Sequence, residues 1–95
     1  MLELVYWHKA RIRKRFVLEM SIHRVKESKR RCDGLKYGLI LVDQHSGARV
    51  LFDNHQPKGP HIHLNDKELP YVFVNEKQLM EDFKRACFEH LGVRL

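Results

Sequence analysis

The amino-acid sequence predicts an α+β domain, in which an antiparallel sheet of four to five strands, built from two hairpins, carries one C-terminal helix on one face. Apolar and polar residues alternate along 16–25, and this period of two is typical of a strand with one buried face. Near the C-terminus the apolar residues instead recur every three or four positions, as in an amphipathic helix. The chain has 95 residues, so we expect residues 1–95 to form a single domain with one core.

The first hairpin is predicted from residues 2–12 and 16–25, which are joined by a basic turn. The second strand should bury Phe16, Leu18, Met20 and Ile22. In the first strand we expect one side to carry Leu2, Leu4, Tyr6 and Ile12, and the solvent side to carry Glu3, Lys9, Arg11 and Arg13. The following residues, 26–34, show no apolar period and end in Asp-Gly, which predicts a basic loop.

The second half of the sheet is predicted from three shorter segments. Residues 36–43 are the most apolar run and fit a central strand, and the turn at 44–47 leads into a partner strand over 48–54. Two prolines and a glycine then exclude regular structure around 56–60. Residues 61–64 fit a short edge strand that ends at 65–67.

The C-terminal helix has the clearest start and stop signals. Asn75 is a favourable N-cap, Gln78 is positioned to complete a capping box, and Val74 is positioned to contact Leu79 as a hydrophobic staple. The apolar stripe consists of Leu79, Met80, Phe83, Ala86, Cys87 and Leu91. Gly92 suits the position just after the helix, so we expect about 16 helical residues spanning roughly 24 Å.

The net charge of +6 is concentrated in the first third of the chain. Residues 1–36 hold eleven Lys and Arg against four acids, a net charge of +7, whereas residues 37–95 have a net charge of −1. Such a basic segment attracts a polyanion such as RNA or DNA, an acidic protein or a membrane surface, or it serves only solubility. The residues that we expect to contact nucleic acid are Lys9, Arg11, Arg13, Lys14, Arg15, Arg24, Lys29, Arg30, Arg31 and Lys58.

Seven histidines occur in the chain, and three of them, His55, His61 and His63, lie within nine residues. Both rings of a His-x-His pair on an extended segment point the same way, so the pair can act as an acid and a base, bind one metal ion, or only cap backbone groups. A metal would need a further ligand from His55, Asp53 or Asp66. Metal-free RNA cleavage would use His61, His63 or His55 as acid and base, with Tyr71 as a further proton donor or stacking face.

Several other classes of protein are excluded by missing motifs. The sequence contains no phosphate-binding Gly-rich loop, no Gly-x-Ser-x-Gly and no His-Glu-x-x-His. Cys32 and Cys87 lie far apart in the sequence, which predicts two free thiols in place of a disulfide or a zinc site. No apolar run approaches the roughly 20 residues of a membrane span, so we expect a cytoplasmic protein without a membrane partner.

Residues 50–85 resemble the TumE-like toxin family of prokaryotic toxin-antitoxin systems. The resemblance rests on Phe52-Asp53-Asn54, on Lys58-Gly59-Pro60-His61-Ile62-His63, on Pro70-Tyr71-Val72-Phe73, and on the helix with Asp82-Phe83. It implies a small intracellular toxin encoded beside a DNA-binding antitoxin of helix-turn-helix or winged-helix type. It points to His61, His63, Asp53, Asn54 and Tyr71 as the functional region and assigns no role to any of them.

These observations lead to two hypotheses. In the first, the protein is a toxin-like protein that binds RNA through the basic N-terminal hairpin and cleaves it with the histidines, without a metal or other cofactor. In the second, it is a non-catalytic module that binds nucleic acid or an acidic antitoxin. Whether the protein is an enzyme and whether it forms a homodimer are both open at this stage.

Overall fold

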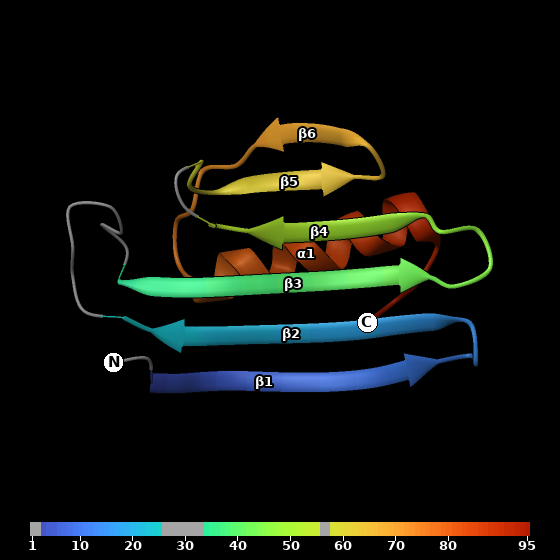
Figure 1. Ribbon diagram of the computed structural model, residues 1–95, viewed down its shortest axis with the longest axis horizontal. Coiled ribbons are helices and arrows are strands. Elements are labelled where there is room, and N and C mark those ends of the chain that lie inside the picture. The colour runs from blue at the N-terminus through green and yellow to red at the C-terminus, as the bar shows by residue number, and fades with distance from the viewer. Residues whose placement is uncertain (1–2, 26–33, 56–57) are drawn as a thin grey trace.

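The computed structural model describes residues 3–25, 34–55 and 58–95, which form six strands and one helix (Figure 1). The elements are β1 (Glu3–Ile12), β2 (Phe16–Arg24), β3 (Leu35–Asp43), β4 (Arg49–Asp53), β5 (His61–Leu64), β6 (Lys67–Pro70) and α1 (Glu76–Leu91). The strands form one sheet in the order β1-β2-β3-β4-β5-β6, and each strand is antiparallel to its neighbours. The predicted α+β fold is confirmed, although the sheet has six strands where four to five were predicted.

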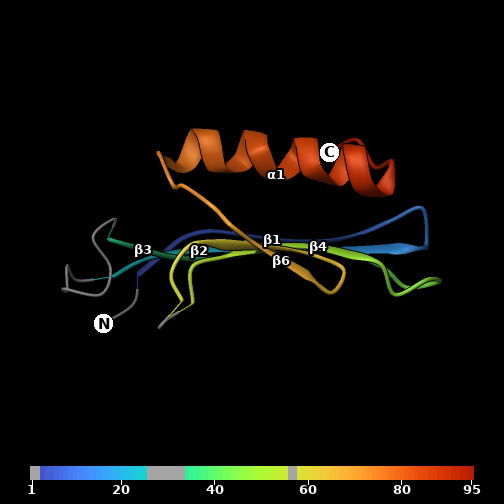
Figure 2. The same cartoon turned by 90° about the horizontal axis from the view of Figure 1, so that it is seen from above.

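The helix packs on one face of this sheet, and no helix or strand among the described residues covers the other face (Figure 2). Because side chains alternate along a strand, each strand sends one set toward α1 and the other set away from it. We call the uncovered side the open face. Its residues, assigned from the strand register, are Leu4, Trp7, Lys9, Arg11, Val17, Glu19, Ser21, His23, Lys36, Gly38, Ile40, Val42, Arg49, Leu51, Asp53, His61, His63, Glu68 and Pro70.

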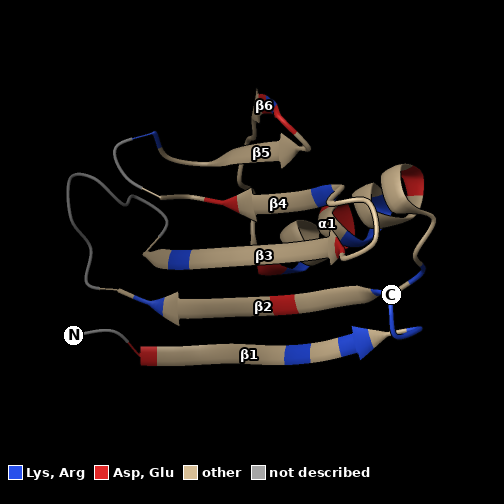
Figure 3. Cartoon of the chain, turned by 45° about the vertical axis from the view of Figure 1, so that its right-hand side comes forward, with Lys and Arg blue, Asp and Glu red and all other residues tan. Residues whose placement is uncertain are grey.

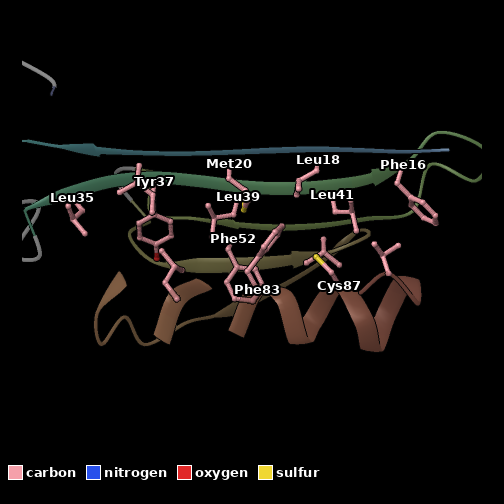
Figure 4. Close-up of a cluster of buried hydrophobic side chains, with 14 residues drawn as sticks. Phe16, Leu18, Met20, Leu35, Tyr37, Leu39, Leu41, Phe52, Phe83 and Cys87 are labelled. Carbon is pink, nitrogen blue, oxygen red and sulfur yellow. The ribbon is translucent and has the colours of Figure 1, made fainter. Parts of the chain in front are cut away.

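The core lies between α1 and the strands β2, β3 and β4 (Figure 4). Phe52 of β4 meets Phe83 of α1 with ring centroids 5.6 Å apart and an interplanar angle of 83°, an edge-to-face contact. The predicted alternation in β2 is confirmed, because Phe16, Met20 and their alternate neighbours are all buried. The helix and the segments that flank it, including Phe73 and Val93, therefore bury the apolar side of the sheet's middle strands.

The ends of α1 follow the predicted caps in part. The Asn75 side chain accepts a hydrogen bond from the Gln78 N–H at 2.8 Å, and Gly92 ends the helix with a φ of 68°. The capping box is not completed, because the Gln78 amide donates forward to Asp82 at 2.8 Å. Val74 is mostly exposed, so the predicted staple does not bury it. No helix in the described ranges has the length and apolar character needed to cross a bilayer.

The predicted sidedness of β1 holds only for its second half. The register of β1 against β2 shifts between Leu4 and Tyr6, as at a β-bulge. Leu4 therefore lies opposite His23 on the open face, while Tyr6 lies opposite Ile22 on the helix side. The expectation that Leu4 and Tyr6 share a face is wrong, since one extra residue in a strand reverses every side chain that precedes it.

The turn between β1 and β2 is attached to the turn between β3 and β4 by an ion pair. Arg15 donates two hydrogen bonds to the Asp43 carboxylate, from Nε at 3.0 Å and from Nη2 at 2.8 Å. Asp43 also accepts from the backbone N–H of His45 and from the Ser46 hydroxyl. This arrangement, with Arg15 as its largest contributor, holds the pKa of Asp43 well below its usual range. It also stabilises a turn in which Arg13 and Lys14 both have a positive φ.

The predicted free thiols can be compared with the structure only at Cys87. This residue is a free cysteine within the core, where burial raises the pKa of its thiol to about 12. Cys32 and the rest of the basic loop at 26–33 lie outside the described residues. The Cys87 thiol is therefore a packing group of α1.

Replacing Asp43 with Asn should lower stability in a pH-dependent way. The folded pKa of Asp43 lies below the unfolded value of about 4, so its stabilising effect is present above about pH 4 and is lost as the pH falls further. Urea midpoints at pH 7 should therefore fall in the Asp43→Asn protein, and the difference from wild type should shrink toward pH 2. The exposed Asp66→Asn variant is the control and should match wild type at both pH values. An equal loss for Asp43→Asn at pH 7 and pH 2 would contradict the account.

Candidate functional site

The sheet register places a histidine cluster at the β4 to β6 side of the open face. Asp53 lies directly opposite His61, and Leu51 lies opposite His63, which in turn lies opposite Glu68 of β6. As predicted for a His-x-His pair, both rings emerge on the same side. Their centroids are 4.8 Å apart with an interplanar angle of 78°.

His61 is fixed by acceptors at both ring nitrogens. Its Nε2 lies 2.9 Å from Oδ1 of Asp53, and its Nδ1 lies 2.6 Å from the carbonyl oxygen of Gly59. Both contacts are hydrogen bonds only when each nitrogen carries a proton, because both partners accept. The residue is only 7% exposed. His61 is thus a buried ring whose orientation is set by Asp53 and Gly59.

His63 is the more accessible of the two rings. Its side chain is 26% exposed, and its Nε2 lies 3.5 Å from Oε1 of Glu68. Glu68 also accepts a hydrogen bond from Nζ of Lys58 at 2.8 Å. Lys58 is the main reason that the pKa of Glu68 lies below its usual value. Of the His61–His63 pair, His63 is therefore the ring that a ligand on the open face can contact more readily.

His55 lies beside the same carboxylate. It follows Asp53 by two residues, its backbone N–H donates to Asp53 Oδ1 at 3.2 Å, and the residue is exposed. Asp53 therefore contacts both a fixed histidine ring and the backbone of an exposed histidine. His55 also lines a depression of about 350 Å³ on the open face.

Tyr71 and Asn54 have structural contacts away from these rings. The Tyr71 ring packs against Phe52 on the helix side, and its hydroxyl donates to Asp82 at 2.6 Å. Burial and this carboxylate raise the pKa of Tyr71. The buried Asn54 side chain accepts from the Tyr37 N–H and donates to the Leu35 carbonyl, which ties the end of β4 to β3. Tyr71 is therefore tied to α1, whereas Asn54 lines the same depression as His55.

A transition-metal ion could find three ligand atoms here. His61, His63 and Glu68 offer atoms that all lie within 4.8 Å of one another. The third group is Glu68, which was not among the further ligands expected from sequence. Asp66, which was one of them, instead lies 4.0 Å from Arg49. Two of the three groups already have close partners, since Asp53 contacts His61 and Lys58 contacts Glu68. A metal would have to displace both of these interactions.

The basic residues that were expected to contact nucleic acid do not share one surface (Figure 3). Lys9 and Arg11 lie on the open face of β1, whereas the turn that holds Arg13 and Lys14 curves toward the helix side (Figure 2). Three more are paired with acids: Arg15 with Asp43, Arg24 with Glu3 and Lys58 with Glu68. Lys29, Arg30 and Arg31 lie outside the described residues.

Sequence reasoning missed two cations and one acid on the open face. Lys36 begins the segment that was interpreted as the most apolar run, Arg49 lies on the strand predicted as its hairpin partner, and Glu68 lies on a strand that was not predicted. A period-two count along β3 and β4 would have placed both cations on the side away from the helix. Glu68 becomes a neighbour of His63 only through the pairing of β5 with β6.

Comparisons with known proteins give no further guidance. No protein-family model matches the chain, and searches of curated proteins and of solved structures found no significant match. The function is therefore inferred from the residues and their geometry.

Replacing Tyr71 with Phe should lower stability without changing any activity on RNA. The variant removes the hydroxyl that donates to Asp82, and a hydrogen bond to a charged group contributes about 1.5–3 kcal/mol. Urea unfolding at pH 7 would measure the loss, and an RNA cleavage assay would be run on the same preparation. Loss of cleavage with unchanged stability would instead place Tyr71 in the chemistry.

Proposed function

We propose that this protein binds single-stranded RNA across the open face and cleaves it without a metal, as a TumE-like toxin. The proposal rests on one observation: the His61–His63 pair, Asp53 and four cations from three strands share one uncovered face. Those cations are Lys9, Arg11, Lys36 and Arg49. The resemblance over residues 50–85 points to the same residues and supports the toxin part of the proposal.

The open face suits single-stranded RNA for physical reasons. A flat strand array with scattered Lys and Arg contacts phosphates, while an exposed aromatic ring stacks on a base. Trp7 is 56% exposed on this face. Two carboxylates of the open face are paired with neighbouring side chains: Asp53 contacts His61, and Glu68 contacts Lys58. The face can therefore approach a polyanion with little repulsion from these two carboxylates.

The reaction needs one base and one acid, and two histidines can supply them. His63 removes the proton of a 2′-hydroxyl, whose oxygen forms a bond to the adjacent phosphorus. The bond from phosphorus to the 5′-oxygen breaks, and His55 donates a proton to that oxygen, leaving a 2′,3′-cyclic phosphate and a 5′-hydroxyl. His63 and His55 each follow one member of the Asp53–His61 pair by two residues. His61 acts as a positioning residue for His63.

Replacing His63 with Ala should reduce RNA cleavage by about 10²–10⁴-fold, which is the usual contribution of an acid or base. The control is His90→Ala, because His90 is exposed in the last turn of α1. Cleavage of a labelled single-stranded RNA and growth inhibition on expression are the measurements. Cleavage at the wild-type rate by a folded His63→Ala protein would overturn the nuclease proposal.

Removing two charges from the open face should weaken RNA binding more than removing two from the turn. The pair Lys9→Gln and Arg11→Gln should lower the slope of log affinity against log salt by about 1.4, or 0.7 for each phosphate contact to a single strand. The pair Arg13→Gln and Lys14→Gln makes the same charge change in the turn between β1 and β2 and is the control. Equal effects from both pairs would show that overall charge, and not the open face, determines binding.

A second candidate function is partner binding through β1, in which the protein docks an acidic antitoxin without catalysis. The observation that favours it is an unpaired sheet edge: among the described strands β1 contacts β2 alone. This edge exposes Leu4, Val5, Tyr6 and Trp7 and carries Lys9 and Arg11. An extended acidic segment, or a second copy of the chain in a homodimer, could add to such an edge.

The two candidates separate in one experiment with the protein encoded by the neighbouring gene. The second candidate predicts two results. The helix-turn-helix protein of the neighbouring gene binds this protein in solution, and this protein alone shows no detectable RNA cleavage. Cleavage by the free protein, suppressed when the neighbour binds, would favour the first.

A further inference from the structure

Gly38 occupies the middle of the sheet, where glycine is an unfavourable choice. It lies in β3 and pairs with Ser21 on one side and Asp53 on the other. Glycine within a strand loses more backbone entropy on folding than other residues and contributes no side-chain packing. A glycine at such a position needs a reason in the backbone, in the packing or in a ligand.

Neither the backbone nor the packing requires glycine at this position. Gly38 is absent from the glycines with a positive φ, so another residue could adopt its conformation. A Cβ added there would meet Ser21 Oγ at 4.0 Å as its nearest neighbour, which is ordinary van der Waals contact. Because Gly38 has no side chain, a depression remains above it on the open face.

This depression is the right size for one small ligand. Its volume is about 350 Å³, and its lining includes Ser21, His23, Lys36, Asp53 and His55, with Gly38 among them. Ligand pockets usually begin at roughly 300 Å³. Side chains from β2, β3 and the end of β4 therefore converge on one small hollow.

The charges around the depression favour a phosphate. Lys36 provides an ammonium group, and His23 and His55 provide two imidazoles from different parts of the sheet. Asp53 is the acidic residue of the lining, but its Oδ1 contacts His61 Nε2 and the His55 N–H. A phosphate would therefore meet one fixed cation and two rings that can donate hydrogen bonds.

Trp7 extends this site toward the edge of the sheet. The register runs from Gly38 through Ser21 to Trp7, so Trp7 lies two strands away, or roughly 10 Å. Its exposed ring offers a stacking face for a base next to the phosphate. A phosphate pocket followed by an aromatic ring is a suitable arrangement for nucleotides of a single strand.

We propose that the depression over Gly38 binds one nucleotide of single-stranded RNA, with its phosphate among His23, Lys36 and His55 and an adjoining base on Trp7. This inference rests on the proposed function for the identity of the strand. It adds a binding site next to the Asp53–His61 pair and gives Gly38 a role. A free mononucleotide shares the same chemistry, so the test includes both ligands.

Filling the depression tests the inference directly. Gly38→Val places a β-branched side chain, which strands favour, into the hollow, so the urea midpoint should stay the same or rise. Binding of a fluorescein-labelled single-stranded uridine hexamer, measured by anisotropy, should weaken by about tenfold or more. The control is Val42→Ile, which adds bulk to the same strand and face outside the depression. This variant should bind within about twofold of wild type.

Each outcome has a defined meaning. Wild-type affinity in a folded Gly38→Val protein overturns the depression as a site, even if RNA still binds elsewhere. If Gly38→Val fails to fold, Lys36→Gln replaces it and must also weaken the hexamer about tenfold, or the proposal fails. Binding of uridine 3′-monophosphate but not the hexamer, lost in Gly38→Val, keeps the site and rejects the RNA function. Binding of neither ligand by wild type rejects both.

Discussion

The structure depends on one constraint, which is that a single helix covers a much wider sheet from one side. Among the described residues α1 and the segments that flank it cover one face of the sheet, where Phe73 stacks on Tyr37 and Val93 is buried. The buried apolar side chains of β2, β3 and β4 all point to that face, which removes them from water. Alternation along the strands then sends the remaining side chains to the open face. The contact of Phe83 with Phe52 and the burial of Leu79 show where this constraint is met most fully. The open face, which carries the proposed functional residues, therefore results from the same alternation of side chains that forms the core.

The sequence predicts those parts of the fold that local patterns determine. The period of two in β2, the apolar stripe of α1 and its end residues Asn75 and Gly92 are properties of neighbouring residues, and all of these are found. The sixth strand, β6, was not predicted, because Lys67 to Pro70 contain a single leucine and end in a proline. Its structure comes from pairing with β5. The bulge near Leu4 likewise depends on how β1 meets β2, which no local pattern records.

The candidate site was predictable to a similar degree. The His61–His63 pair could be recognised from spacing alone, since an extended segment turns both rings to one side. The partners that decide their chemistry come from other strands, as Asp53 comes from β4 and Glu68 from β6. The same applies to Gly38, which is one more apolar position in the sequence and becomes informative only between Ser21 and Asp53. Cross-strand register is therefore the information that the sequence alone lacks.

The central claim is that RNA binds to the open face. The most direct measurement is a titration of the ¹⁵N-labelled protein with a single-stranded RNA, following every backbone amide by NMR. The account predicts that the largest shifts fall on open-face residues such as Ser21, Gly38 and Asp53 and spread toward Trp7 and His63. Shifts confined to the outer side of α1, at residues such as Lys84 and Glu81, would contradict it.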